Sequence, residues 1–180
     1  MLEGKKVRLR LRDKEDLDFF WEFWNNINYY GEYEAIQHQI TKGEAEKRIE
    51  NPSSNSGVEW TWFVIEKKDG TKIGFIIYFT VQPFGEIHVG YALIPNERDK
   101  GYGTEALQIV IDYLFLTKDI MRVQASTDVR NKASQRILEK ADFKKEGVIR
   151  KGSFVRGQWA DEYLYGILRE DWKGPKILTK

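Results

Sequence analysis

The sequence contains no cysteine and only two histidines, His38 and His88. Without cysteine, the chain has no disulfide bond, no thiol nucleophile and no thiolate ligand for a metal ion. The two histidines lie far apart in the sequence, and no group of carboxylates has the spacing of a metal site, so no metal is expected. A Gly-x-Ser-x-Gly motif is also absent, which leaves no sequence sign of an α/β-hydrolase.

Long apolar runs and an excess of charge of either sign are also lacking. No stretch approaches the roughly 20 apolar residues of a membrane span, and the N-terminus lacks the apolar segment of a signal peptide, so a cytoplasmic protein is expected. The 29 Lys and Arg residues nearly balance the 28 Asp and Glu residues, for a net charge of +1. Because bulk attraction to nucleic acid or to a membrane needs surplus positive charge, neither is expected as a partner.

The composition is that of a globular protein. Hydrophobic residues make up 41% of the 180 residues and aromatic residues 14%, enough for one domain, 1–180, with a core of its own. Residues 171–180 are expected to form a C-terminal extension.

Alternation, capping residues and turn residues predict the order of the elements. Asp13 is expected to cap a helix whose apolar side carries Leu17, Phe20, Trp21 and Trp24. Thr41-x-x-Glu44 is a capping box for a second helix that ends near Glu50. The expected strands are 7–12, 59–66, 72–80, 86–94, 121–127, 143–155 and 158–168, with loops or turns at 51–57, 69–70 and 83–85. Further helices are expected to start at Gly103 and to span 131–141.

The stretch 97–106 is the most informative part of the chain. A polar run with two glycines, Gly101 and Gly103, leads from a strand into a helix. The first turn of a helix exposes unpaired N–H groups at the positive end of the helix dipole, which favours a bound anion. Arg98 and Lys100 add positive charge, so a diphosphate fits this site. On the helix, Ala106, Leu107, Val110, Ile111 and Leu114 are expected to face the core, and Glu105, Gln108 and Asp112 to face solvent.

Two families use such a glycine pair. Gly101-x-Gly103-x-x-Ala106 matches the dinucleotide fingerprint, but there the first glycine follows its strand directly, in an opening βα unit. Here a polar run separates strand and glycine, and the motif lies past the middle of the chain. The dinucleotide interpretation is therefore set aside.

The run Arg98-Asp99-Lys100-Gly101-Tyr102-Gly103 resembles the [QR]-x-x-G-x-[GA] pyrophosphate loop of the GNAT superfamily of acetyl-CoA-dependent N-acetyltransferases. The neighbouring 90–95 and 104–107 segments are similar to the branch with the ribosomal-protein N-terminal acetyltransferases and the spermidine acetyltransferases. Asn131 to Phe143 resembles that branch's N-x-x-S-x-[RK]-x-x-E-x-x-G-F helix. Asp142 replaces the usual glycine at a left-handed position, a change that Asp tolerates.

The resemblance implies a fold, a cofactor and a set of contacts. The fold is α+β, a three-layer arrangement with a mixed, mostly antiparallel central sheet of about seven strands and helices on both faces. A bulge is expected to splay the central strand from its neighbour. The cofactor is acetyl-CoA, or CoA after transfer. Its expected contacts are Tyr91, Ala92, Leu93, Ile94, Arg98, Asp99, Lys100, Gly101, Tyr102, Gly103, Thr104, Asn131, Ser134 and Arg136.

The resemblance also places the catalytic groups. A general base is expected on the strand before the glycine loop, where Glu86 and His88 point to one face with Gly90, and the choice between them stays open. Ser134 stands where the branch has the serine that donates a proton to the thiolate, with Tyr163 and Tyr165 in reserve. Another base of some relatives corresponds to Ser153, so that base is missing.

The acceptor is expected to be a primary amine: a protein N-terminus, a polyamine or a small amine. The resemblance places it beside the first helix pair, where Tyr29, Tyr30, Tyr33, Glu32 and Glu34 would suit an amine through cation–π contacts and charge pairing. The same aromatic run also fits plain core packing. A non-catalytic CoA sensor or assembly module is the alternative function, and a homodimer is left open.

Overall fold

The computed structural model describes residues 1–51, 58, 60–81 and 85–178. The expected loop over 52–57, the strand position 59 and most of the turn at 83–85 lie outside the described residues.

The described residues form one mixed sheet of eight strands in the order β1-β2-β3-β4-β5-β6-β8-β7. The strands are β1 (Leu2–Glu3), β2 (Val7–Leu11), β3 (Trp60–Lys67), β4 (Lys72–Val81), β5 (Glu86–Leu93), β6 (Arg122–Asp128), β7 (Lys144–Val155) and β8 (Gln158–Leu168). The helices are α1 (Leu17–Asn25), α2 (Lys42–Glu50), α3 (Tyr102–Thr117) and α4 (Lys132–Lys140). Apart from the short β1, each of these elements was predicted from the sequence.

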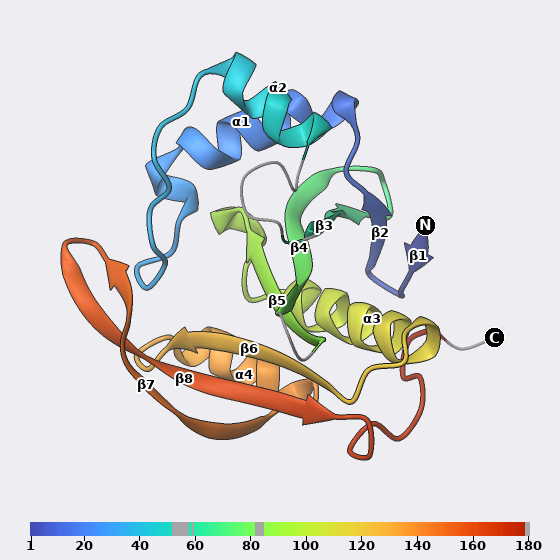
Figure 1. The fold of residues 1–180 in the computed structure, drawn as a ribbon. Coiled ribbons are helices and arrows are strands. Elements are labelled where there is room, and N and C mark those ends of the chain that lie inside the picture. Colours follow the sequence, from blue (N-terminus) through green and yellow to red (C-terminus); the bar gives the residue numbers. More distant parts are fainter. Residues whose placement is uncertain (52–57, 59, 82–84, 179–180) are drawn as a thin grey trace.

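Helices cover both faces of the sheet, which confirms the three-layer α+β fold (Figure 1). The α1 and α2 face buries Phe20, Trp24, Ala45 and Val64 as one aromatic-rich core. The larger core lies on the other face, where α3 and α4 pack against the strands through residues such as Leu107, Val110 and Leu138. The sheet therefore separates two apolar layers.

The strands β5 and β6 diverge at the centre of the sheet. They run parallel and pair only at Ile87 with Val123 and His88 with Gln124. Beyond that point β5 stays with β4 in unbroken antiparallel register, while β6 continues along β8. The expected splay is present, but no bulge in the β4–β5 pairing produces it. The splay arises because β6 follows the twisted β7–β8 hairpin instead of β5.

Two acidic residues of α3 that were expected to face solvent are buried, so this prediction was wrong. Glu105 is 8% exposed and Asp112 only 2%. The Oε1 atom of Glu105 accepts a hydrogen bond from the backbone N–H of Lys6 at 2.8 Å. Asp112 accepts from Trp172 Nε1 and from the N–H groups of Lys176, Ile177 and Leu178. Each carboxylate therefore binds a segment near one end of the chain. Helix periodicity does not predict where such a distant segment lies.

The C-terminal segment is consequently part of the core. Trp172, Ile177 and Leu178 pack against the main apolar cluster, and the indole of Trp172 lies 5.5 Å from the ring of Phe115. The extension expected over 171–180 is thus packed against the fold in its described part, which ends at Leu178.

The helix starts follow the predicted capping chemistry. Thr41 and Glu44 form the capping box of α2. Asp13 caps a 3-10 turn that leads into α1.

The buried side of α1 differs from the predicted one. Trp21, expected in the core, is 38% exposed, and Phe23 is fully buried in its place. The buried side of α1 is rotated relative to the predicted side, because the aromatic side chains of β3 and β4 contact α1 at Phe20, Phe23 and Trp24.

Candidate functional site

A deep cleft of about 980 Å³ opens where β5 and β6 separate. Its walls come from the ends of both strands, the start of α3, one side of α4, the loop between α1 and α2, and the β7–β8 hairpin. Segments far apart in the sequence therefore meet at one place, the point at which the sheet is interrupted.

The first turn of α3 forms one end of the cleft. Gly101 is the N-cap residue and has a left-handed backbone with φ of 84°, a conformation that suits glycine. Gly103 is buried, and a Cβ there would lie 3.2 Å from the side chain of Ile137. The N–H groups of the first helical positions have no partner within the helix, so they face the cleft as donors. This geometry is that of an anion site.

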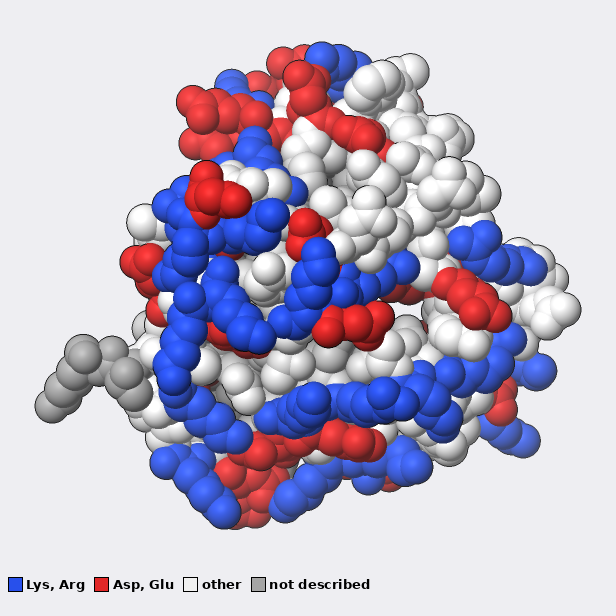
Figure 2. Space-filling model, turned by 180° about the vertical axis from the view of Figure 1, so that it is seen from behind, with Lys and Arg blue, Asp and Glu red and all other residues white. Residues whose placement is uncertain are grey.

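Positive charge surrounds this end of the cleft. Arg136 and Lys140 line the wall from α4, four residues apart on one side of the helix, with Lys132 one turn earlier. Figure 2 shows Lys and Arg side chains in a band across the lower half of the rear face, at the height of α4 in Figure 1. A ligand with several phosphate groups is well matched by such a row.

Arg98, which was expected to face a diphosphate, donates hydrogen bonds to two backbone carbonyls of the chain. Its Nε donates to the backbone carbonyl of Leu93 at 3.0 Å, and its Nη2 donates to the carbonyl of Tyr29. The guanidinium thus joins the end of β5 to the loop that follows α1. Arg98 lines the cleft, but its hydrogen bonds fasten two walls together.

A pair of hydroxyl groups bridges β5 and α4. Tyr91 Oη lies 3.0 Å from Ser134 Oγ. Burial raises the pKa of the Tyr91 phenol well above its usual value, an effect that the hydrogen bond with Ser134 only partly offsets. The phenol is therefore protonated at neutral pH and is a proton donor. Asn131 caps α4 by accepting from the N–H of Ser134 at 3.0 Å, which fixes the start of that helix beside the cleft.

Most of the predicted cofactor residues do line this cleft. They are Tyr91, Ala92, Leu93, Arg98, Asp99, Gly101, Gly103, Thr104, Asn131, Ser134 and Arg136. Ile94, Lys100 and Tyr102 lie outside its wall. Lys100 pairs with Glu97 at 3.0 Å, and its carbonyl accepts from Lys6 Nζ. The hydroxyl of Tyr91 was missed, because the sequence pointed only to the backbone of that strand.

The two candidate bases on β5 lie toward the closed end of the splay, outside the cleft wall. Glu86 faces Arg122, with 3.6 Å between Oε1 and Nε. His88 stacks on Phe79 at 5.2 Å between ring centroids, and burial lowers the pKa of its imidazole. His88 is thus neutral near pH 7. A role for either residue in proton transfer stays a prediction.

The loop between α1 and α2 forms another wall of the cleft. Tyr30, Glu32, Tyr33 and Glu34 line it, together with Trp60 and Trp62 from β3. Ser153 lies across from them, on β7, with a buried hydroxyl that has no hydrogen-bond partner. Of the expected amine-binding residues, Tyr30, Glu32, Tyr33 and Glu34 therefore line the cleft, and Tyr29 does not.

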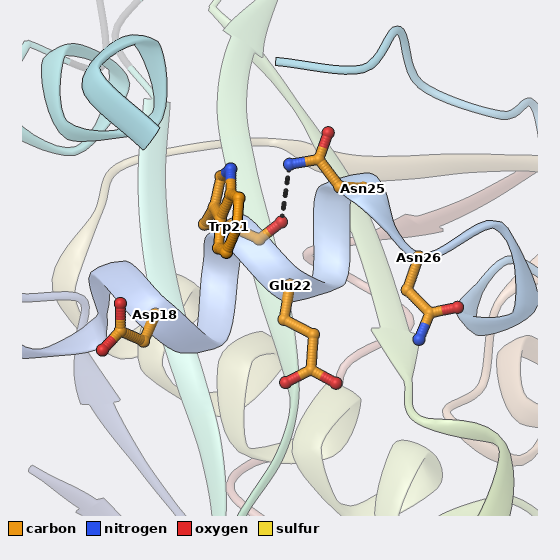
Figure 3. A pocket seen from close by; sticks show the side chains of 5 residues that line it. All are labelled: Asp18, Trp21, Glu22, Asn25 and Asn26. Atoms are coloured by element: carbon orange, nitrogen blue, oxygen red, sulfur yellow. Dashed lines mark hydrogen bonds between the residues drawn. The ribbon is translucent and has the colours of Figure 1, made fainter. Parts of the chain in front are cut away.

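A smaller hollow of about 420 Å³ lies on α1, away from the cleft (Figure 3). Its polar groups already have partners within the chain. Asn25 donates to the carbonyl of Trp21 at 2.9 Å, and Glu22 accepts from the hydroxyl of Tyr29. It shares no lining residue with the large cleft, so we assign the chemistry to the latter.

The described residues contain neither a group of metal ligands nor a helix suited to crossing a membrane. In this part of the chain no group of three or more His, Asp or Glu side chains is arranged to hold a metal ion. None of the described helices combines the length and apolar character that crossing a membrane would require.

Comparisons with known proteins agree with this geometry. Residues 6–144 match the sequence profile of a family described as "Acetyltransferase (GNAT) domain". The chain is 30% identical over 185 residues to the "Probable N-acetyltransferase YjcK" of Bacillus subtilis (strain 168), covering 95% of this chain and 98% of that protein.

Solved structures share the fold. A ribosomal-protein-S5-alanine acetyltransferase from Vibrio fischeri matches with a TM-score of 0.80 and 27% identity, covering 95% of this chain and 97% of that one. A spermidine N-acetyltransferase from Vibrio cholerae, solved with CoA and spermine, matches with a TM-score of 0.78 at 21% identity over 92% of this chain and 96% of that one. The fold, the cleft at the splayed strands and the profile match lead to one conclusion: the chain belongs to the GNAT family of acetyl-CoA-dependent N-acetyltransferases.

Proposed function

We propose that this enzyme transfers the acetyl group of acetyl-CoA to a primary amine by direct attack in a ternary complex. One observation carries the proposal. The anion-binding start of α3 and the amine-suited loop after α1 line a single cleft, together with Tyr91 and Ser134, whose hydroxyls meet there. Both substrates fit together, and holding two reactants side by side lowers the barrier of a bimolecular step.

In this proposal the cofactor lies along the splay. The amides of residues 101–104 bind the diphosphate, and Arg136 and Lys140 face the remaining phosphate. The free backbone edge of β5 from Gly90 to Leu93 pairs with the pantetheine arm, because β6 has left that edge unpaired. Acetyl-CoA supplies the activated thioester, and the chain holds its carbonyl beside β5.

The proton for the departing thiolate comes from the hydroxyl pair. We assign this donation to Tyr91, whose buried phenol is protonated at neutral pH, and Ser134 holds it in place. This assigns to Ser134 a positioning role beside the acid role that the family resemblance implies.

The acceptor class is inferred from the cleft and the relatives together. The similar proteins named above act on a ribosomal-protein alanine and on spermidine, which share a primary amine. The loop after α1 and strand β8 bring the carboxylates of Glu32, Glu34 and Glu162 to the cleft. Such carboxylates can pair with a cationic acceptor, although arginines line the same cleft.

Two measurements on the purified protein test the proposal. Calorimetry with CoA measures cofactor affinity, and a thiol-release assay with acetyl-CoA measures transfer to a panel of protein N-terminal peptides, polyamines and small amines. Micromolar CoA binding with turnover of at least one amine is expected. Tight CoA binding without transfer to any amine would favour the sensor or assembly alternative, and no CoA binding would remove both.

A further inference from the structure

The acceptor end of the cleft needs a group that binds an ammonium ion and takes its proton. Aromatic ring faces were expected among the binders, but arginines of the chain itself already cover one expected ring, Tyr33, and two further rings that line the cleft. Arg12 lies 4.7 Å from the ring centroid of Trp62, Arg130 lies 5.3 Å from Tyr33, and Arg48 lies 5.7 Å from Trp24. Those three rings are therefore not open for a cation, and a carboxylate is the better candidate.

The carboxylates of the cleft differ in their availability. Asp128 is fully buried and paired with Arg130 at 2.6 Å. Glu32 is exposed at the rim. Glu162 lies at the far wall on β8, over Gly152. Glu34 remains, half-buried in the loop that closes the cleft, and among the described residues no ion pair includes it.

Glu34 is held at a defined place. Its Oε1 lies 3.3 Å from the point that a Cβ on Gly31 would occupy, and Nη1 of Arg98 lies 3.7 Å from the same point. Its backbone N–H donates to the carbonyl of Gly31 at 3.2 Å. The carboxylate and the guanidinium thus share one small space without forming a salt bridge.

Two arginines fix this loop from opposite sides of the cleft. Arg98 of the cofactor loop binds the carbonyl of Tyr29. Arg156, at the turn of the β7–β8 hairpin, donates to the carbonyls of Tyr30 and Gly31 at 3.2 and 3.4 Å. The hydrogen bonds of both arginines go to backbone oxygens and tie the loop to the cofactor loop and to the hairpin, while the Glu34 carboxylate interacts with the backbone of Gly31.

The electrostatic surroundings favour proton transfer. Burial raises the pKa of the Glu34 carboxyl, although the charges of Arg98 and Arg156 and the backbone of Gly31 act in the opposite direction. The charge of Glu34 in turn contributes to the raised pKa of both Tyr91 and Tyr30. A carboxylate whose pKa is nearer neutrality is a better base toward an ammonium ion.

We propose that Glu34 is the residue that binds the acceptor ammonium group and removes its proton, a role that rests on the proposed amine acetylation. One proton passes from R–NH₃⁺ to the carboxylate, and the neutral amine attacks the thioester carbonyl. The C–N bond forms, the C–S bond breaks, and the thiolate takes a proton from Tyr91. The second amine proton returns to Tyr91 through water, and Glu34 releases its proton to solvent.

The test compares three single substitutions by their kcat/KM for the best amine of the panel across pH 5 to 9. Glu34→Gln is expected to lower kcat/KM about 100-fold or more, the usual size of a general-base contribution, and to remove the acid limb of the pH profile. Glu34→Asp keeps the charge and should retain that limb with a raised KM. Glu46→Gln, a matched charge removal at an exposed position of α2 outside the cleft, is expected to leave kcat/KM within a few-fold of wild type.

The outcomes separate this inference from the proposed function. CoA affinity measured by calorimetry should stay within a few-fold of wild type in each variant, which shows that the cleft is intact. If wild type acetylates amines and Glu34→Gln keeps its rate and acid limb, the role of Glu34 is refuted while the function stands. Loss of the limb in Glu162→Gln instead would give the base to Glu162. If wild type acetylates no amine, the function itself fails.

Discussion

The phenol of Tyr91, on strand β5, lies 3.0 Å from the hydroxyl of Ser134, in the first turn of α4. The contact crosses the cleft at the level where the two strands have separated, so it joins the two halves of the sheet without a backbone hydrogen bond between β5 and β6. A protonated phenol at this place is the natural donor to a leaving thiolate.

We expect Tyr91→Phe to lower kcat about 100-fold, as for loss of a general acid, while CoA affinity changes little. Ser134→Ala should have a smaller effect on kcat, because the phenol remains. Because the pKa of Tyr91 is raised, the phenol stays protonated through pH 10, and no alkaline loss of activity from this group is expected below that pH. The thiol-release assay over pH 6 to 10 measures all three. Tyr113→Phe on α3 is the matched control, and an equal loss there would contradict the assignment.

Substitutions of Gly101 separate backbone strain from cofactor binding. Its φ of 84° is accessible to asparagine but costs a β-branched residue about 1–2 kcal/mol. Gly101→Asn should leave the free energy of unfolding within about 1 kcal/mol of wild type and weaken CoA binding about tenfold, because a side chain crowds the diphosphate. Gly101→Val should lose both stability and affinity. Urea unfolding and calorimetry measure the two quantities, and unchanged CoA affinity in both variants would refute the site.

Asp112 anchors the C-terminal segment on α3. Its Oδ2 accepts from the N–H of Ile177 at 2.8 Å and from that of Lys176 at 2.9 Å. Because Asp112→Ala leaves several buried donors unpaired, we expect the free energy of unfolding to fall by about 3 kcal/mol. Limited proteolysis should then cleave the chain after Leu168. Asp119→Ala, at an exposed position after the same helix, should change stability by less than about 0.5 kcal/mol. Equal effects of the two would show that the segment is not held by Asp112.

Asp16 makes stability depend on pH at the acid end. Burial acts to raise the pKa of its carboxyl, but hydrogen bonds from Arg10, Lys72 and the backbone of Asp13 outweigh it and lower the pKa to about 2. A lowered pKa means that this stabilisation is present above about pH 4 and is lost as the pH falls toward 2.

Asp16→Asn should therefore cost about 2 kcal/mol at neutral pH, the size of a charged hydrogen bond, and should flatten the stability profile between pH 4 and 2. Asp18→Asn, whose side chain is 81% exposed, is the control and should keep the wild-type slope. Urea titrations at several pH values measure the effect. A slope unchanged in Asp16→Asn would contradict the assignment.

The local signals in the sequence were reliable because they describe interactions between near neighbours. The capping box at Thr41 and Glu44, the cap at Asp13, the left-handed position of Asp142 with φ of 67°, and the glycine turn before α3 all formed as expected. Each depends on the backbone preferences and side-chain reach of a few consecutive residues. The cofactor half of the cleft could be predicted for the same reason, since a loop and a helix terminus make most of it.

The predictions that depended on direction in three dimensions were less successful. The 3.6-residue period placed Asp112 and Glu105 away from the core, yet terminal segments cover that side of α3. Trp21 and Phe23 exchanged places because the position of β3 and β4 sets the buried side of α1. Periodicity tells which residues share a side of a helix, but not what other segment comes to lie against it.

The sequence by itself determined the order of the elements, the family and the glycine loop with its helix, since these follow from residues adjacent in the chain. Only the tertiary structure decided that β6 leaves β5 after His88, that Arg98 binds Leu93 and Tyr29, and that Glu34 is enclosed at the acceptor end. Most of these features need contacts between residues distant in the sequence, such as Arg98 and Tyr29, which are 69 positions apart. Such contacts arise from the packing of the whole sheet, which no local pattern encodes.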